Sequence, residues 1–422
     1  MVTFLVLILL LAIGAPIAFS ILLAMVTYLV QSDYPLSLVA TRIFSGLDSF
    51  AILAIPLFVL AGELMNESGI TGRIIRFANA LVGHMKAGLA QVNIWASVIF
   101  AGLSGSAVAD TSALGRVFIP EMEKDGYPRD FAAALTAASS VIGPMIPPSI
   151  PVIIYALITT GTSVPGLFLA GIAPGVLLAI GLSLYVRFRA GHYAPQHARV
   201  SRREQLRALG TAWVPLFMPV FIVGSILTGI VTPTEAAALA AGYALLAGMF
   251  ILRSLSFEQL PGIFIRAMRD SSVILIIIAV VAAANWLLTF ARVPQSLSQL
   301  VLDQVSDPWV FLLLVNVILL VVGLFLEGIA AMLVLLPILH PIAMALGIDP
   351  THFGIVVIFN LMIGLVTPPM GICLFVSNSI ANVGMGAISR RILPLFLVEL
   401  LVLGLITFVP QTVTFLPRLF GY

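Results

Sequence analysis

The chain has 422 residues, and apolar side chains dominate its composition. Apolar residues make up 61% and charged residues 9%, with a formal net charge of +2. Ordinary soluble domains contain about 25% charged residues, and a folded chain of this size exposes too much surface to keep so many apolar side chains out of water. The composition excludes a soluble enzyme, a disulfide scaffold built on the single Cys373, and a basic surface that binds nucleic acid. It predicts an all-α polytopic protein in the lipid bilayer.

Apolar segments follow one another closely along residues 1–85, which we expect to form scaffold helices. Residues 2–30 lack the basic start of a signal peptide and are longer than its apolar region, so they predict a first membrane span that is retained. Because a helix needs about 20 apolar residues to cross a bilayer, the whole chain predicts roughly ten to twelve crossings together with some re-entrant elements.

Residues 87–123 predict a helical hairpin. Two apolar arms, each short for a membrane span, flank a tip of small residues at positions 101–110. Non-helical backbone is tolerated at membrane depth only where it is buried in protein or lines a polar cavity. An acid in such a segment is costly, so Asp110 is a candidate functional residue. A cap on the helix after the tip is an equally good interpretation of Asp110, and the two roles are compatible.

Residues 128–161 predict a helix that is broken near its middle. The break lies at residues 143–149, where a glycine and three prolines occur together. Proline removes a backbone donor and clashes with the carbonyl four residues earlier, so this turn should unwind. The freed carbonyls suit Na⁺, and the freed N–H groups at the start of the next half-helix suit a carboxylate. For one break alone, a proline-kinked transmembrane helix is the alternative.

The most polar segment, residues 187–207, holds six arginines and one acid. The positive-inside rule assigns it to the cytoplasmic side, and residues 196–210 predict a linker between two halves of the chain. We interpret the segment as a solvated loop, with contact to lipid headgroups or to a partner as the alternative.

The two halves, residues 1–195 and 211–422, predict two inverted structural repeats. In the second half, residues 307–346 predict a hairpin with its tip at 323–330, and residues 350–381 predict a helix broken at 364–371. The halves align without a gap over this region when the chain is shifted by 221 residues. The glycines and prolines in register include Gly102 with Gly323, Gly143 with Gly364, Pro147 with Pro368, and Pro148 with Pro369.

Each tip, together with the break of its own half, predicts a cation site, and the break and its polar neighbours predict a substrate site. The residues predicted to bind Na⁺ are Ser104, Gly105, Ser106, Gly143, Pro144, Gly323, Glu327, Gly328, Gly364, Val366 and Thr367. The residues predicted to bind substrate are Ser106, Asp110, Pro147, Pro148, Ser149, Asn360, Pro368, Pro369 and Gly371. Glu327 also fits a helix cap. Glu63 is a weaker candidate for a functional acid. Glu235 is better explained as a residue in the first turn of a helix that begins after Thr232.

The sequence offers no motif for ATP or for nucleophilic catalysis. It lacks a phosphate-binding glycine loop and an H-E-x-x-H motif, and the serine-rich tip has no nearby histidine. We therefore expect no enzyme activity, no transition metal and no ATP, and we expect an ion gradient to supply the energy for uphill transport.

These segments together resemble the large membrane subunit of the TRAP transporters, the tripartite ATP-independent periplasmic transporters. The resemblance rests on residues 102–112 and 143–149 in the first half and on residues 347–354 and 364–371 in the second. It extends to two further segments, residues 50–58 and 231–237, and covers essentially the whole chain. The motifs are specific together and weak singly.

The resemblance implies an elevator-type fold that cotransports Na⁺ with a small organic acid, typically a C4-dicarboxylate or sialic acid. It implies two partners, a small four-helix membrane subunit and a soluble periplasmic substrate-binding protein, and a place in the cytoplasmic (inner) membrane of a bacterium or archaeon. The family's Na⁺ sites would lie where residues 104–110 meet 143–149 and where 324–330 meet 364–371. Many relatives are expected to have aspartate at the position of Glu327. A stand-alone Na⁺/carboxylate symporter without a binding protein is the alternative.

Overall fold

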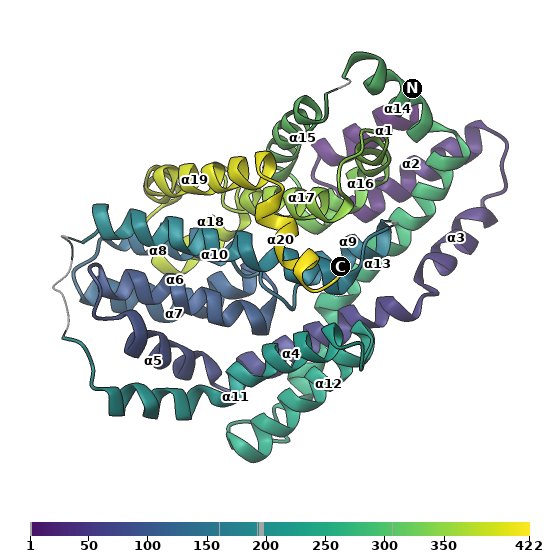
Figure 1. The fold of residues 1–422 in the computed structure, drawn as a ribbon. Helices are drawn as coiled ribbons and strands as arrows, with labels where there is room; N and C mark the ends of the chain where they lie inside the picture. The colour runs from purple at the N-terminus through teal and green to yellow at the C-terminus, as the bar shows by residue number, and fades with distance from the viewer. Residues whose placement is uncertain (1, 160, 192, 194–197, 306) are drawn as a thin grey trace.

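The computed structural model describes residues 2–159, 161–191, 193, 198–305 and 307–422, and within these ranges the chain is helical and contains no strand (Figure 1). Seven helices in this part are long and apolar enough to cross a membrane. Further apolar helices in the described residues are 10–17 residues long, and four of them belong to the predicted hairpins and broken helices. The number of crossings, roughly ten to twelve from the apolar segments, stays a prediction.

The N-terminal helices do not form the single span that residues 2–30 predict. The chain turns at Gly14, where φ is 80°, and a new helix begins after Pro16, because glycine adopts this left-handed conformation easily and proline cannot continue a helix. The first helices are α1 (Val2–Ala12), α2 (Ile17–Gln31), α3 (Ser37–Leu47), the 3₁₀-helix η1 (Phe50–Leu53), α4 (Ala54–Glu67) and α5 (Ile70–Val82).

The first half continues with two helices joined by a short tip and then with two helices separated by a proline-rich segment. Helices α6 (Gly88–Ser104) and α7 (Ala107–Lys124) are joined by a two-residue tip, Gly105 and Ser106. Helix α8 (Arg129–Ser140) ends before the proline-rich segment, and α9 (Ile150–Ile158) follows it. Residue 160, within the predicted range of the broken helix, lies outside the described residues.

The second half contains the same succession of elements. Helices α15 (Pro308–Gly323) and α16 (Gly328–Ala345) flank the tip, and α17 (Pro350–Gly364) and α18 (Ile372–Ala381) flank the break. Both breaks contain a cis peptide bond between their adjacent prolines. Helix α14 (Val293–Gln304) precedes this half's hairpin, and α19 (Met385–Phe408) and α20 (Gln411–Leu419) end the chain.

Long helices connect these elements. They are α10 (Val164–Arg189), α11 (Arg202–Leu227), α12 (Pro233–Leu246), continued by the π-helical turn η2 (Ala247–Ile251), and α13 (Leu260–Phe290). Residues 196 and 197 of the predicted linker lie outside the described residues. Residues 202–210 of that linker are helical, because Ser201 and Glu204 form a capping box that starts α11 there. A second capping box, between Thr232 and Glu235, begins α12 and confirms the helix start interpreted from the sequence.

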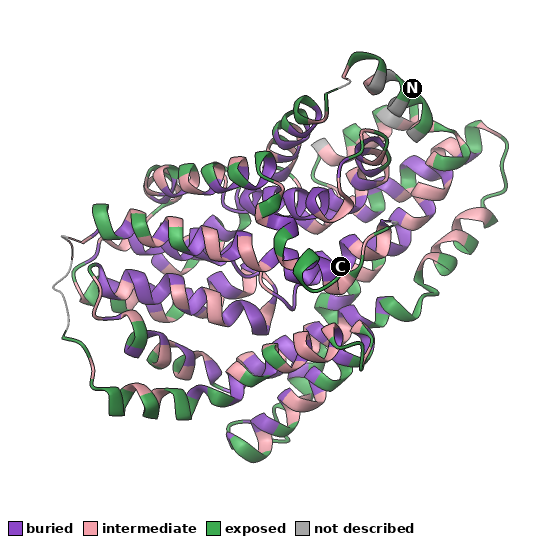
Figure 2. Cartoon of the chain, viewed as in Figure 1, coloured by how far each residue is buried: buried purple, intermediate pink, exposed green. Residues whose placement is uncertain are grey.

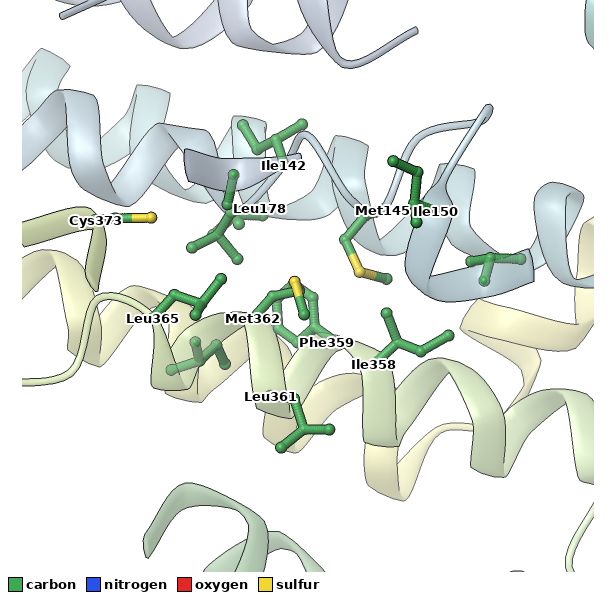
Figure 3. Close-up of a cluster of buried hydrophobic side chains, with 14 of the residues drawn as sticks. Ile142, Met145, Ile150, Leu178, Ile358, Phe359, Leu361, Met362, Leu365 and Cys373 are labelled. Carbon is green, nitrogen blue, oxygen red and sulfur yellow. The ribbon is translucent and has the colours of Figure 1, made fainter. Parts of the chain in front are cut away.

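Three of the four halves of the broken helices, α8, α9 and α17, consist mostly of buried residues (Figure 2). Every residue of α17 from His352 to Gly364 is buried, as is typical of a helix that is apolar on all sides. Ile142 and Met145 of the first break lie opposite Phe359 and Met362 of α17 (Figure 3). Helix α4 packs on α12 and α13 in a neighbouring layer (Figure 1). The two breaks are thus held together by one apolar core.

Candidate functional site

The first tip contacts the first break through backbone atoms. Gly105 has φ 58°, and a Cβ atom at this position would lie 2.7 Å from the carbonyl oxygen of Pro148. A side chain at this position would therefore meet both backbone strain and a backbone clash. Ser106 is extended and caps α7 by accepting a hydrogen bond from the N–H of Ala109 at 3.4 Å. This close approach places the polar end of α6 against the unwound segment between α8 and α9.

Asp110 lies behind the first tip and is fully buried. Its Oδ1 accepts a hydrogen bond from the hydroxyl of Ser104. Its Oδ2 is buried and has no hydrogen-bond partner among the described residues, and it occupies the space that a Cβ atom on Gly143 in the break would need. A buried carboxylate oxygen without a partner is costly. A cation held between the tip and the break would supply the missing interaction.

The first break is organised by Ser149, which caps α9. Its hydroxyl donates to the carbonyl of Pro144 and accepts from the N–H of Val152 at 3.3 Å. The break therefore keeps a fixed shape although several of its residues lie outside any helix. The first turn of α9 points its N–H groups, and hence the positive end of its dipole, at this region.

The second tip meets the second break through two glycines. A Cβ atom on Gly364 would lie 2.8 Å from the Cα of Gly323 and 3.0 Å from its carbonyl carbon and oxygen. The end of α15 and the end of α17 can approach this closely only because neither residue has a side chain. Gly328, the first residue of α16, lies against Met362 of the same broken helix. This contact fixes the second tip on the second break.

Polar groups at this second contact are partly engaged within their own elements. Glu327 caps α16, and its Oε2 accepts from the N–H of Ala330 at 3.1 Å. The hydroxyl of Thr367 donates to the carbonyl of Ile363 at 2.8 Å, which leaves its oxygen free to accept or to coordinate. The capping role of Glu327, one interpretation of the sequence, is therefore confirmed.

A cavity of about 160 Å³ lies where the two halves meet. Its wall includes the first tip, the start of α9, the second tip and α17, and is completed by α4 and α13. The polar or proline residues that line it are Glu63, Asn66, Ser104, Ser106, Pro144, Pro151, Asp270 and Glu327. The N-termini of α7, α9 and α16 all reach this wall, so three positive helix ends converge on one space.

The structure brings only some of the predicted site residues to this cavity. Those that line it are Ser104, Gly105, Ser106, Pro144 and Glu327. Others lie behind the wall, where they build the two contacts between tip and break or continue the breaks themselves. These are Asp110, Gly143, Pro147, Pro148, Ser149, Gly323, Gly328, Gly364, Val366, Thr367, Pro368, Pro369 and Gly371. Asp110, predicted to contact substrate, thus has no face on the cavity.

Asn360 lies apart from both sets. Its amide nitrogen donates to the side-chain oxygen of Asn316 at 2.8 Å, and Asn316 in turn donates to the hydroxyl of Thr407 at 2.9 Å. This buried chain joins α17 to α15 and α19. In this conformation Asn360 therefore links helices and does not line the cavity.

The sequence interpretation missed part of the cavity wall. Asn66 and Asp270 line it, and Glu63, only a weak candidate from the sequence, lines it too. Arg266 holds this side in place, since its guanidinium bonds Glu63 at 3.1 Å and Glu67 at 2.6 Å. The sequence contained a pattern that could have indicated this wall: charged residues recur at intervals of three or four along α4 and α13, and residues at that spacing share one helix face.

The sequence interpretation also missed Glu399, the single acid in α19. It is fully buried, and neither carboxylate oxygen has a hydrogen-bond partner among the described residues. An acid within an apolar helix is a functional candidate by default, and that rule alone was enough to single it out.

We expect Glu399→Met to raise the thermal unfolding midpoint of the purified protein. Methionine keeps the length of the side chain and removes two unpaired polar atoms, which should stabilise the fold by about 1–3 kcal/mol. Asn316→Leu, which removes a satisfied buried amide, should instead lower the midpoint. A fall in midpoint for Glu399→Met would mean that the carboxylate has a partner that stabilises the fold.

Comparison with known proteins identifies the chain at the level of its family. Residues 4–412 match the family model described as "Tripartite ATP-independent periplasmic transporter, DctM component". The chain is 41% identical to the sialic acid TRAP transporter large permease protein SiaM of Vibrio cholerae, over 97% of this chain and 96% of that protein. It is 36% identical to the C4-dicarboxylate TRAP transporter large permease protein DctM of Rhodobacter capsulatus, over 97% and 96%.

The fold is also found among solved structures. The Alcanivorax borkumensis YdaH transporter matches with a TM-score of 0.62 at 16% identity, covering 87% of this chain and 88% of that one. Together with the seven apolar helices, these relatives make the protein a multi-pass transporter of the inner membrane and not an enzyme. The chain belongs to the DctM family, the large permease components of the tripartite ATP-independent periplasmic transporters.

Proposed function

We propose that this large permease couples the entry of Na⁺ to the uptake of a small organic acid anion. The single observation that carries this proposal is the buried, unpartnered Oδ2 of Asp110, which lies beside the break at Gly143. A cation is the simplest partner for a carboxylate oxygen that no described donor reaches. Na⁺ suits such a site because it accepts hydroxyl, carbonyl and carboxylate oxygens together.

The first proposed Na⁺ site lies between the first tip and the first break. Asp110, the hydroxyls of Ser104 and Ser106 and the backbone around Gly143 and Pro144 would supply its oxygens, with Gly105 closing the tip. The second site lies between the other tip and break. It would use Glu327, Thr367 and backbone carbonyls around Gly364 and Val366, at the place where Gly323 and Gly328 contact the broken helix.

The substrate would bind in the cavity between the two sites. The N-termini of α7, α9 and α16 reach its wall, and helix N-termini attract carboxylates through their free N–H groups and dipoles. The volume of about 160 Å³ suits a small acid or one end of a longer one. A Na⁺ ion on either side would lower the cost of holding the anion in a water-poor site, which couples the two bindings.

The partners and the movement are proposed from the family. We infer a small membrane subunit and a periplasmic substrate-binding protein, because tripartite systems provide them, and a substrate among sialic acids or C4-dicarboxylates, because relatives carry those names. Two inverted repeats would let the part that contains the tips and breaks move as an elevator against the scaffold helices. The lining of one cavity by α4 and α13 together with both tips fits such a sliding boundary.

Uptake into proteoliposomes tests the proposal. The large permease, its small subunit and its binding protein loaded with labelled acid are combined with and without an inward Na⁺ gradient. We expect accumulation only with the gradient and only with the binding protein. Full-rate uptake without Na⁺ would contradict the coupling, and uptake by this chain alone would favour a stand-alone symporter.

Single hydroxyl groups at the tips and breaks should tune the Na⁺ dependence. We expect Ser106→Ala and Thr367→Val each to lower the apparent affinity for Na⁺ roughly 5- to 20-fold without unfolding the protein, because each removes one hydroxyl contact worth about 1–2 kcal/mol. Initial uptake rates as a function of Na⁺ concentration measure the effect. Unchanged Na⁺ affinity in both variants would contradict the placement of the sites.

A further inference from the structure

A second cavity, of about 630 Å³, shares no lining residue with the first and lies at the junction of α10, α8 and α19. We call it the arginine pocket. The end of α10 and the start of α19 lie side by side and form most of it (Figure 1). Its lining consists of arginine, aromatic and proline side chains: Phe131, Tyr185, Phe188, Arg189, Tyr193, Arg390, Arg391 and Pro394.

The charge of the arginine pocket is only partly compensated. Arg391 is held by Asp130, with its Nε 2.9 Å from the Oδ2 of that carboxylate. Neither Arg189 nor Arg390 forms an ion pair with any described residue, and no described acid lines the pocket. Two guanidinium groups from different helices therefore face one space. Guanidinium groups match the oxygens of phosphates and carboxylates through paired N–H donors, so the pocket suits an oxyanion such as a phosphate better than a simple halide.

An exposed apolar stripe leads away from the pocket along each helix. Both stripes repeat every four residues, which keeps them on one face of the helix. On α10 the stripe is Phe188, Leu184 and Ile180, exposed by 78%, 51% and 43%, and on α19 it is Leu393, Leu397 and Leu401, exposed by 51%, 59% and 73%. Both helices are long and apolar enough to cross a membrane, so these stripes are suited to contact acyl chains.

The pocket also lies at the correct level of the bilayer for a headgroup. Arg187 and Arg189 end α10, and the arginine-rich segment up to Arg207 follows, which assigns this end to the cytoplasmic side. Arginines at this surface meet the anionic lipids of the cytoplasmic leaflet. Because α19 begins at the same pocket, its Arg390 lies at the same level as Arg189.

We propose that the arginine pocket binds the phosphate headgroup of an anionic phospholipid from the cytoplasmic leaflet. Arg189 and Arg390 bind the phosphate, Arg391 and Asp130 fix the shape of the pocket, and the acyl chains lie along the two apolar stripes. A peptide partner is less well matched, because the apolar contacts continue into the membrane and the polar contacts are confined to one end.

Native mass spectrometry of the full chain, purified with its accompanying membrane subunit, tests the proposal. The probes are phosphatidylglycerol and phosphatidylcholine with the same acyl chains. We expect wild type to retain phosphatidylglycerol preferentially. The double variant Arg189→Gln, Arg390→Gln should lose this preference by roughly tenfold or more, because each arginine near the membrane surface contributes to the binding of an anionic lipid and the variant removes two of them. The double variant Arg187→Gln, Arg207→Gln removes the same charge outside the pocket and should retain the preference.

Three results would overturn the proposal. Equal losses in the two double variants would show a general effect of surface charge. Displacement of phosphatidylglycerol by inorganic phosphate alone would show a site for a free anion, in which the acyl chains take no part. Loss of bound lipid whenever the membrane subunit is present would assign this face to a protein contact. Thermal unfolding of each variant checks that the fold is retained, and Arg390→Lys, which keeps the charge without the paired donors, should show an intermediate loss.

Discussion

Replacing Asp110 with asparagine is expected to abolish Na⁺-driven uptake while the protein stays folded. Asparagine has nearly the same shape and can still bond to Ser104, but its amide cannot offer the buried negative oxygen that lies beside Gly143. Removing one partner of a buried charge pair costs about 3–5 kcal/mol, so the apparent affinity for Na⁺ should fall by more than about 100-fold. Uptake at increasing Na⁺ concentrations and the shift of the unfolding midpoint by Na⁺ measure it independently.

Glu121→Gln is the matched control for this variant. Glu121 lies on the same helix, α7, but at its exposed end, where it pairs with Lys124 at 2.7 Å. Exposed pairs of this kind contribute about 0–1 kcal/mol, so the control should leave both stability and Na⁺ dependence close to wild type. If Asp110→Asn transports with wild-type Na⁺ affinity, the first Na⁺ site lies elsewhere, whether or not the family assignment holds.

The local features of the site could be predicted from the sequence because they depend on glycine and proline. Both breaks and both tips are encoded by residues whose backbone effects do not need tertiary context, such as Gly105 at φ 58° and the paired prolines of each break. The helix starts at Ser201 and Thr232 follow from capping boxes of the same local kind. These features fixed where the helices of each half are interrupted.

The long-range features could not be predicted in the same way. The apolar runs of α4 and α13 do not show which face of each helix contacts the tips. That Asn66 and Asp270 line the cavity could therefore be seen only in the packed structure. Asn360 lies four residues before the second break, which suggested a place near the cavity. In the structure its side chain instead bonds Asn316 and does not line the cavity. In a chain that is apolar on nearly all helix faces, periodicity carries little information about which helices become neighbours.

The same argument applies to single polar residues within helices. Asp110 and Glu327 drew attention because they occur at tips that are unusual in sequence, whereas Glu399 occurs in an otherwise ordinary apolar helix. The cost of burying a carboxylate is the same in both contexts, so the rule for intramembrane acids is more general than any motif. Applied without regard to motifs, it would have selected all three residues.

Gly364→Ala is expected to lower stability and uptake together. Its Cβ would lie 2.8 Å from the Cα of Gly323 and 3.0 Å from its carbonyl group, and backbone atoms at the meeting of two helix ends cannot turn away as a side chain can. Forcing one methyl group into a packed contact costs about 1–3 kcal/mol, and here it would also separate the second tip from the second break. The thermal unfolding midpoint and the Na⁺ dependence of uptake should therefore both change.

Gly404→Ala gives the matched control for this substitution. Gly404 also lies within a long apolar helix, α19, but a Cβ atom there would have no neighbour within 4 Å. Alanine favours a helix over glycine by about 1 kcal/mol, so the control should keep or slightly raise the unfolding midpoint. Because the two variants add the same methyl group, a difference between them reports the contact of Gly364 with Gly323. Equal midpoints would mean that the second tip and break do not need this close approach, and the second Na⁺ site would then lack its structural basis.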